Sequence, residues 1–479
     1  IPIDEDITME KLVDIVDNSS WEEFMPSGVT KEMFKSFIKY YDPEIFVAAG
    51  RRIRTTVLSA DELSPTERVK KIAQLFACFK NPDKETVLTP WRVVNMHMSD
   101  CLGGYDFYDE AHEQMMDKPR FVDRGKVTAD TFANAGARVL EINSKTGLYP
   151  LYVTYSIFRS RCAACSEEEL DDAKLQQLWD ATVRENVFVI CKTKMAKQIT
   201  RRTLAGYRKI PVNAHYFDDL INMMKNKPRQ FVDRVLKPSY WKQEGVKAMK
   251  FDAVVGNPPY VRNKNMNLGT KDRLANWTSS AIGNVDLYIP FFEIGIKLLS
   301  YNGKLGYISP NSYLQAVNGR NLRKYFSTEQ YQIKIIDFRD SQVFENVTSY
   351  TCITLVDKSI ETDTIKYLRL NETNTLEKHM FSEYHYLDFP DGKPWRMRER
   401  SIDEVIYKLE SSGTPLSNWK IRNGLATLKN DIYFFTPIKE DNTYYFREYN
   451  NKIYKIEKKL CIKVAKPNII KNETELKKK

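Results

Sequence analysis

Short apolar runs alternate with helical stretches from about residue 87 to residue 358, and this alternation limits the possible folds more than any other feature. When strands and helices alternate along a chain, the strands usually pair in parallel and the helices cover the faces of the sheet. The sequence therefore predicts an α/β fold with a doubly wound sheet of seven strands. The predicted strands are residues 138–142, 187–190, 210–212, 251–255, 305–308, 333–338 and 351–356.

Residues 1–85 lack this alternation and are expected to form helices joined by polar segments. The clearest helix should begin at Ser64, with Pro65 in its first turn and Glu67 completing a capping box. No cluster of catalytic residue types occurs here, so an accessory or coupling role is expected. The predicted buried face of this helix carries Val69, Ile72, Phe76 and Phe79.

From about residue 362 the chain becomes rich in Lys, Asn and Tyr, and its apolar alternation is weak. A separate and less regular domain is therefore expected there. At 479 residues the chain is also too long for one compact core. The predicted domains are residues 1–85, 86–361 and 362–479.

The composition favours a negatively charged partner. Lys and Arg total 73 against 63 Asp and Glu, and this net charge of +10 attracts phosphate backbones. Seven scattered cysteines, no run as long as a membrane span and no signal-peptide pattern predict a cytoplasmic protein without membrane association. Because the chain begins at Ile1 and ends in three lysines, we expect it to be a piece of a longer polypeptide.

The predicted strand at 251–255 leads into the sharpest motif of the sequence, Asn257-Pro258-Pro259-Tyr260. In open α/β sheets, ligands bind beyond the carboxyl ends of the strands. An aromatic amine is a poor nucleophile because its lone pair is delocalised into the ring. The Asn257 side-chain oxygen and the Pro258 carbonyl can each accept one amine N–H, which aims the lone pair at a methyl sulfonium. The motif therefore predicts methyl transfer to such an amine.

Aromatic residues supply the expected contacts to the base. Tyr260 can stack on a base that has turned out of a duplex, and Phe344 is the candidate for the second face. Flipping costs a few kcal/mol, whereas stacking returns roughly 1–3 kcal/mol per base, so two rings hold the base better than one. A rigid turn without chemistry is the alternative for the tetrapeptide, because Asn and Pro are common turn residues.

The cofactor is expected at the predicted strand 138–142 and the turn that follows it. Glu141 would meet the ammonium of the methionine moiety of S-adenosylmethionine, in a charge-assisted hydrogen bond. Asn143 and Gly147 lie in the turn and are candidate contacts, since a glycine lets the backbone approach a ligand. A strand and a loop with one glycine also occur in most nucleotide-binding folds, so this motif is weak by itself.

Phe217 and Asp218 follow the predicted strand at 210–212. Asp218 is a candidate acceptor for the amine of the cofactor's adenine, with Phe217 against the ring; a helix cap is the alternative role for Asp218. No metal is expected, because Cys162 and Cys165 have no second pair or close histidine to complete four ligands, and they should serve helix packing.

The sequence from about Thr89 to Lys358 resembles the amino-methyltransferases of the gamma motif order, specifically N6-adenine DNA methyltransferases of bacterial restriction-modification systems. The matching elements occur in the order of that family. They are Thr89-Pro90, which lies beside the cofactor in the family, Glu141 and Gly147 of the first cofactor motif, Asp218 of the third, Asn257-Pro258-Pro259-Tyr260 of the catalytic loop, residues 286–288, 303–310 and 322–326, and Phe344 as the second stacking aromatic.

The resemblance implies a Rossmann-like class I methyltransferase core, S-adenosylmethionine as cofactor and double-stranded DNA as partner. It also implies a target-recognition domain that opens near residues 421–427 and is only partly present, and nuclease or helicase parts elsewhere in a longer polypeptide. Two features depart from the family pattern. No acid for the ribose follows residues 187–190, and Asn143, Ser144 and Lys145 make the first cofactor turn poor in glycine.

Three alternatives stay open. An RNA adenine methyltransferase or a protein glutamine methyltransferase faces the same lone-pair problem, although the basic tail and Thr89-Pro90 favour DNA. A DNA-binding subunit with a weak cofactor pocket would explain the missing ribose acid.

Overall fold

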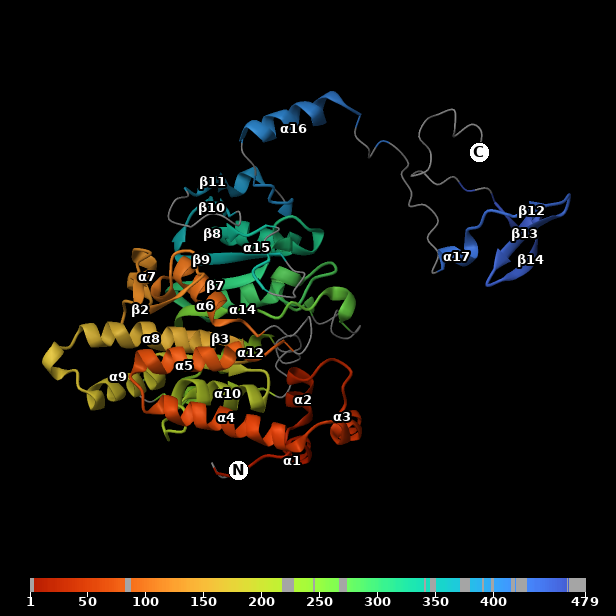
Figure 1. Ribbon diagram of the computed structural model, residues 1–479. Helices are drawn as coiled ribbons and strands as arrows, with labels where there is room; N and C mark the ends of the chain where they lie inside the picture. Colours follow the sequence, from red (N-terminus) through yellow and green to blue (C-terminus); the bar gives the residue numbers. More distant parts are fainter. Residues whose placement is uncertain are drawn as a thin grey trace. The chain divides into compact units, whose positions relative to one another are not determined.

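The computed structural model has two compact units, Ile1–Met397 and Arg398–Lys479 (Figure 1). It describes residues 4–81, 88–217, 228–243, 246–266, 274–339, 342–344, 350–370, 380–389, 392–397, 400–414, 418, 429–462 and 464. The expected start of the target-recognition domain at 421–427 lies outside these residues. The domain limits at 85/86 and 361/362 stay predictions, and both fall inside the first unit.

The first unit is built on one mixed sheet, which has nine strands among the described residues in the order β11-β10-β8-β9-β7-β6-β3-β4-β5. Neighbours from β7 to β5 are parallel, whereas β9 is antiparallel to both β7 and β8. From β8 to β5 this is the order of the predicted class I methyltransferase core. The strands are β3 (Val139–Ser144), β4 (Val187–Cys191), β5 (Asn213–Tyr216), β6 (Phe251–Gly256), β7 (Leu299–Pro310), β8 (Tyr331–Asp337), β9 (Thr351–Glu361), β10 (Thr364–Arg369) and β11 (Ser382–His385).

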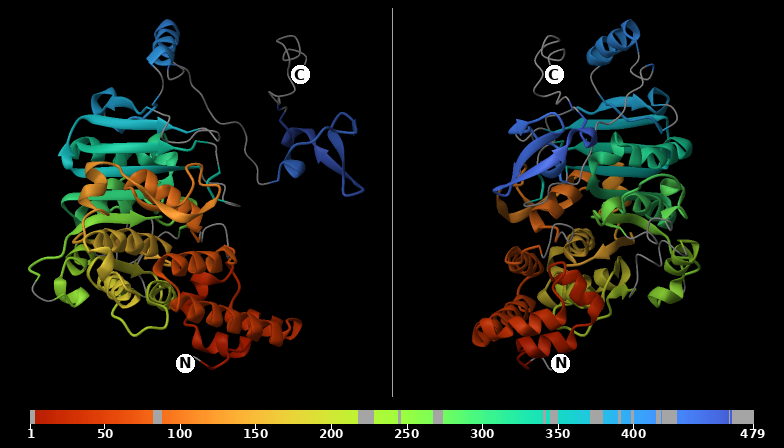
Figure 2. Two further views of the ribbon diagram at one scale, coloured as in Figure 1. Left: turned by 60° about the vertical axis from the view of Figure 1, so that its left-hand side comes forward. Right: turned by 90° about the vertical axis from the view of Figure 1, so that its right-hand side faces the viewer.

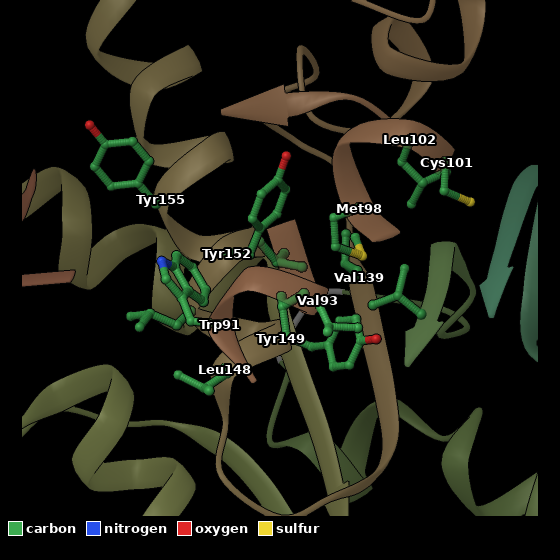
Figure 3. Packing of buried hydrophobic residues seen from close by; sticks show 14 of the residues in the cluster. Trp91, Val93, Met98, Cys101, Leu102, Val139, Leu148, Tyr149, Tyr152 and Tyr155 are labelled. Carbon is green, nitrogen blue, oxygen red and sulfur yellow. The ribbon is translucent and has the colours of Figure 1, made fainter. Parts of the chain in front are cut away.

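Near-continuous apolar runs form the central strands because both faces of the sheet are covered. Every residue of β3 and β4 is buried. Val139 and Ala253 belong to the core on one face, and their neighbours Leu140 and Val254 belong to the core on the other. Figure 3 shows part of the first core, where residues of α6 and α8 pack on Val139.

Helices cover both faces of the sheet. The face with Val139 is covered by α4 (Pro43–Asp61), α5 (Pro65–Ala77), α6 (Trp91–Cys101), α8 (Leu148–Ala163), α9 (Asp172–Glu185) and α10 (Lys194–Ala205). The other face is covered by α12 (Pro228–Val235), α14 (Ile289–Leu298) and α15 (Arg320–Glu329). A hairpin of β1 (Gly104–Tyr108) and β2 (Met115–Val122) follows α6, and α7 (Lys126–Asp130) comes next.

The N-terminal helices pack on this core beside α8, α9 and α10 (Figure 2). They are α1 (Met9–Ile15), α2 (Asn18–Phe24), α3 (Lys31–Phe37), α4 and α5. The predicted start of α5 is confirmed, because the Ser64 side chain accepts the Glu67 N–H. Val69 and Ile72 are buried as predicted, but Phe79 lies past the helix end and is 46% exposed.

One predicted strand lies at the wrong residues. The sequence places it at 210–212, whereas β5 begins at Asn213 and pairs with β4 from Phe188 onward. The Asn213 side-chain amide donates to the carbonyls of Arg184 and Val187, and these bonds fix the start of the strand.

The second unit contains a three-stranded antiparallel sheet of β12 (Lys439–Glu440), β13 (Tyr444–Tyr449) and β14 (Lys452–Glu457), with α16 (Arg400–Ser412) and α17 (Asn430–Tyr433). Across the described ranges of both units, none of the helices combines the length and the apolar character that a membrane crossing needs.

Candidate active site

The two predicted halves of the site meet where β3 and β6 lie side by side. Glu141 pairs with Val255 across the two parallel strands. Gly256 ends β6 with φ of +144°, a conformation that favours glycine, and a Cβ there would lie 3.4 Å from Glu141 Cγ. The carboxyl of Glu141 therefore sits beside the first residue of the Asn257 loop.

The amide of Asn257 is held in one orientation. Its Nδ2 donates a hydrogen bond to Thr89 Oγ1 at 3.1 Å, which turns Oδ1 away from Thr89. Oδ1 is buried and has no hydrogen-bond partner within the described parts of the chain. A buried acceptor without a partner costs about 1–3 kcal/mol, so its presence calls for a donor from a ligand.

Thr89 is fixed by the helix that it precedes. Pro90 is the N-cap of α6, and all residues of that helix except Arg92 are buried. The helix packs tightly on β7, because a Cβ on Gly306 would lie 2.8 Å from Cys101 Sγ. Thr89 thus reaches Asn257 from a rigid support, while Pro90 itself is exposed.

Tyr260 and Phe344 lie together, as the sequence predicts, but not as two parallel faces. Their ring centroids are 6.3 Å apart, and the rings are inclined by 81°. Tyr260 Oη donates to the Ile308 carbonyl at 3.3 Å, and Phe344 is only 2% exposed. The two rings therefore pack edge to face against each other. Pro258 and Pro259 occupy the loop between Asn257 and Tyr260.

Glu141 carries a second open acceptor. Its side chain is buried, and Oε2 has no hydrogen-bond partner among the residues that the structure describes. Burial raises the pKa of this carboxyl to about 8, although the Ser144 hydroxyl and the charge of Lys145 act in the opposite direction. A bound cation would supply the missing partner and favour the carboxylate.

Two residues at the end of β3 and after it have positive φ: Asn143, at an irregularity inside the strand, at +71°, and Gly147, in the following turn, at +77°. A Cβ on Gly147 would lie 3.0 Å from the backbone Cα of Thr200 and 3.2 Å from Thr203 Cβ. The close approach of α8 to α10 therefore requires this glycine, a packing reason that the sequence analysis did not identify.

Phe217 follows β5 and is largely buried. Its ring stacks on Tyr240 at 6.1 Å with an interplanar angle of 16°, and Phe231 lies 5.6 Å away. Asp218, the predicted partner of the cofactor's adenine, lies outside the described residues. Tyr240 is an addition that no motif predicts.

Tyr149 is a buried residue that no motif of the sequence singles out. It stands in the first turn of α8 and is labelled in Figure 3. His97 Nδ1 lies 2.8 Å from its hydroxyl. Burial raises the pKa of Tyr149, and the charges of Tyr260 and Glu141 add to the rise. In the sequence, Tyr149 looks like any other aromatic residue of a buried helix.

The sequence predicts that Cys162 and Cys165 bind no metal and serve helix packing. Cys162 is buried on α8, and the Cys165 thiol lies 3.6 Å from the Arg161 carbonyl oxygen. In the described ranges, no three His, Cys, Asp or Glu residues gather in a way that could hold a metal ion.

Comparison with known proteins places this site in a family context. Residues 185–344 match the model of the Eco57I restriction-modification methylase family. The chain is 31% identical to the Type II restriction enzyme and methyltransferase RM.Eco57I of Escherichia coli, over 44% of this chain and 22% of that protein. It is 30% identical to the Type II methyltransferase M.BstVI of Geobacillus stearothermophilus, over 42% of this chain and 40% of that protein. The match therefore spans less than half of either relative.

Among solved structures, a nuclease-deletion mutant of the Type ISP restriction-modification enzyme LlaGI, in complex with a DNA substrate mimic, is similar with a TM-score of 0.47 and 14% identity. The similarity covers 78% of this chain and 37% of that one.

The family match contains Asn257, Tyr260 and Phe344. The part of the chain that contains these three residues is thus similar to the Eco57I restriction-modification methylase family.

Proposed function

We propose that this chain transfers a methyl group from S-adenosylmethionine to the N6 amine of a flipped adenine in DNA, as the modification part of a restriction-modification enzyme. The observation that carries the proposal is the buried, unpaired Oδ1 of Asn257. Asn257 follows the carboxyl end of β6, where open α/β sheets bind ligands. It also lies within residues 185–344, which match the model of a restriction-modification methylase family.

Asn257 and Pro258 act on the amine. Asn257 Oδ1 accepts one N–H of the adenine amine, and the Pro258 carbonyl accepts the other. Two acceptors in fixed positions localise the nitrogen lone pair and hold it in line for attack on the methyl carbon. Thr89 keeps the Asn257 amide from turning, because Nδ2 already donates to its hydroxyl. The acceptors are in place before the base arrives, so little reorganisation is needed.

Glu141 fits the ammonium of S-adenosylmethionine, because it offers an unpaired, buried carboxylate oxygen beside Gly256. When bound, the cofactor supplies a methyl group that is attached to a sulfonium sulfur, and this sulfur leaves as a neutral thioether when the methyl group is transferred. Phe217 and Tyr240, already stacked, offer an aromatic wall at the end of β5. Asn143, near the end of β3, and Gly147, in the turn after it, are further candidate contacts to the cofactor.

Tyr260 and Phe344 receive the base. When adenine binds, stacking on the base would replace the edge-to-face contact of the two rings. The ring of Tyr260 would rotate for this, which changes its 3.3 Å hydrogen bond to the Ile308 carbonyl. Stacking of roughly 1–3 kcal/mol per base would compensate the cost of flipping. The net charge of +10 favours the DNA backbone as partner. The proposal also includes nuclease or helicase parts of a longer polypeptide as partners of this chain.

Thr89 provides a test of this arrangement. We expect Thr89→Val to lower kcat for methyl transfer about 10- to 100-fold, because the loss of one hydrogen bond lets the Asn257 amide turn. KM for S-adenosylmethionine should change little. Thr89→Ser keeps the hydroxyl and should restore most of the rate. Steady-state kinetics of the two variants check this, and an equal loss in both would contradict a role of the hydroxyl.

The choice of acceptor is tested by offering the native protein methyl-labelled S-adenosylmethionine with duplex DNA, structured RNA or a protein extract. Label in DNA alone is the expected result. Label in RNA or in protein would replace the proposed substrate with one of the two alternatives. DNA binding without any cofactor binding would support the non-catalytic subunit instead.

A further inference from the structure

A buried acid from the N-terminal helices reaches the cofactor edge of the sheet. Glu23 lies in α2, is 2% exposed, and packs where β4 ends. The hydroxyl of Thr193, two residues past the end of β4, donates a hydrogen bond to Glu23 Oε2. The Met195 N–H donates to Ser20 Oγ at 3.1 Å, so α2 is also fastened to the start of α10. Figure 1 shows α2 in the N-terminal region of the chain.

The second oxygen of this carboxyl is open. Glu23 Oε1 is buried and has no hydrogen-bond partner in the part of the chain that is described. Burial raises the pKa of Glu23, while the Thr193 hydroxyl and the charges of Lys145 and Lys192 oppose the rise. An acid buried to this extent, with one oxygen unused, is costly unless something else donates to it.

The hydrogen bond from Thr193 places Glu23 at the carboxyl end of β4. The charges of Lys145, in the turn after β3, and of Lys192, directly after β4, both act on this carboxyl. Burial raises the pKa of the Cys191 thiol, and the carboxylates of Glu141 and Glu23 both add to the rise. Cys191 is thus within electrostatic reach of the two acids that carry open oxygens.

This position has a known chemical use. In nucleotide-binding α/β folds, an acid beyond the second strand of the binding unit accepts hydrogen bonds from the hydroxyls of the ribose. The chain has no acid there of its own, because Lys192 and Thr193 follow Cys191 directly. A carboxylate oxygen is the acceptor that a pair of sugar hydroxyls requires.

We propose that Glu23 binds the ribose hydroxyls of S-adenosylmethionine, so that the N-terminal helices complete the cofactor pocket of the methyltransferase core. The inference rests on the proposed function for the identity of the cofactor. It assigns to residues 1–85 a direct part in ligand binding, in addition to any coupling role. Thr193 acts as a positioning residue that holds the carboxyl by Oε2 and leaves Oε1 for the sugar.

The test is calorimetry or equilibrium dialysis of the complete chain with S-adenosylmethionine, adenosine and 2′,3′-dideoxyadenosine. The native protein should bind adenosine about 10- to 100-fold more tightly than the dideoxy compound. Glu23→Ala and Glu23→Gln should weaken binding of S-adenosylmethionine by a similar factor and reduce the preference for adenosine to about twofold or less. Glu22→Gln is the matched control, because this exposed neighbour has the same chemistry and should bind all three as the native protein does.

Two results separate the possible failures. Glu23 variants that remain folded and keep the full preference for adenosine would overturn the ribose contact, while the proposed methyl transfer would stand. Since Glu23→Gln preserves the shape of the side chain and can still accept from Thr193, it guards against loss of folding in Glu23→Ala. A native protein that binds neither S-adenosylmethionine nor adenosine would overturn the proposed function together with this inference.

Discussion

Asn257→Ala is expected to lower kcat for methyl transfer to DNA by about 10²–10³-fold, with the affinity for S-adenosylmethionine nearly unchanged. The substitution removes Oδ1, the acceptor that the proposal uses only at the reacting amine. The Thr89 contact, which involves Nδ2, is lost at the same time, but it serves only to orient the amide. Single-turnover rates and calorimetric titration with the cofactor measure the two effects separately.

The matched control is Asn257→Asp. A carboxylate keeps two acceptor oxygens, and the Thr89 hydroxyl can turn to donate to one of them. This variant should therefore retain much more activity than Asn257→Ala. Equal losses in rate and in cofactor affinity for the alanine variant would show that Asn257 shapes the pocket and has no specific role at the amine.

Glu141→Gln should weaken S-adenosylmethionine binding about 10- to 100-fold at pH 8, because an amide cannot provide the charge-assisted bond that a carboxylate gives to an ammonium. The change is nearly isosteric, so the buried end of β3 should keep its structure. Calorimetry on the native protein and the variant at several pH values gives both the affinity and its dependence on protons.

The pH dependence has a definite sign. Burial raises the pKa of the Glu141 carboxyl to about 8, so below this pH the protein without ligand holds the proton. Binding of a cation requires the carboxylate, and the proton must then be released. The native affinity should rise by about tenfold per pH unit from pH 6 toward pH 8, where the ammonium of the cofactor begins to lose its own proton. The affinity of Glu141→Gln should be flat over this range. A flat profile for the native protein would contradict the assignment.

The sequence predicted most of the sheet because most strands are buried on both faces. The five residues of β4 are all apolar apart from the cysteine thiol. A short apolar run of this length is typical of a strand that is buried on both faces. β5 was misplaced because its residues, from Asn213 to Tyr216, have no apolar pattern, and long-range hydrogen bonds set its start. The β1–β2 hairpin was missed for the same reason, since β2 contains Asp, Lys, Pro and Arg.

Motif order predicted that the candidate residues gather in one region, but it could not show how they touch. Asn257 and Thr89 are 168 positions apart, and their hydrogen bond depends on how α6 docks on β7. The sequence treated Thr89 as a cofactor contact, which stays a prediction. It also assigned Gly147 to the ligand, which stays a prediction, and it did not show that the distances to Thr200 and Thr203 require a glycine for helix packing.

Glu23 shows most clearly what local sequence motifs cannot predict. The absence of an acid after β4 is visible in the sequence, yet the acid that lies there comes from 170 positions earlier. Nothing in the pattern of α2 marks Glu23 as different from Glu22 beside it. Only the fold shows that one is exposed and the other is buried against Thr193.

Methyl transfer to adenine N6 is measured most directly by nucleoside analysis of duplex DNA after incubation with methyl-labelled S-adenosylmethionine. We expect the label to appear as N6-methyladenine with the native protein and to be reduced at least about 10²-fold with Asn257→Ala. Label on cytosine, on a protein or on RNA, or equal N6-methyladenine from native protein and Asn257→Ala, would contradict the proposed reaction.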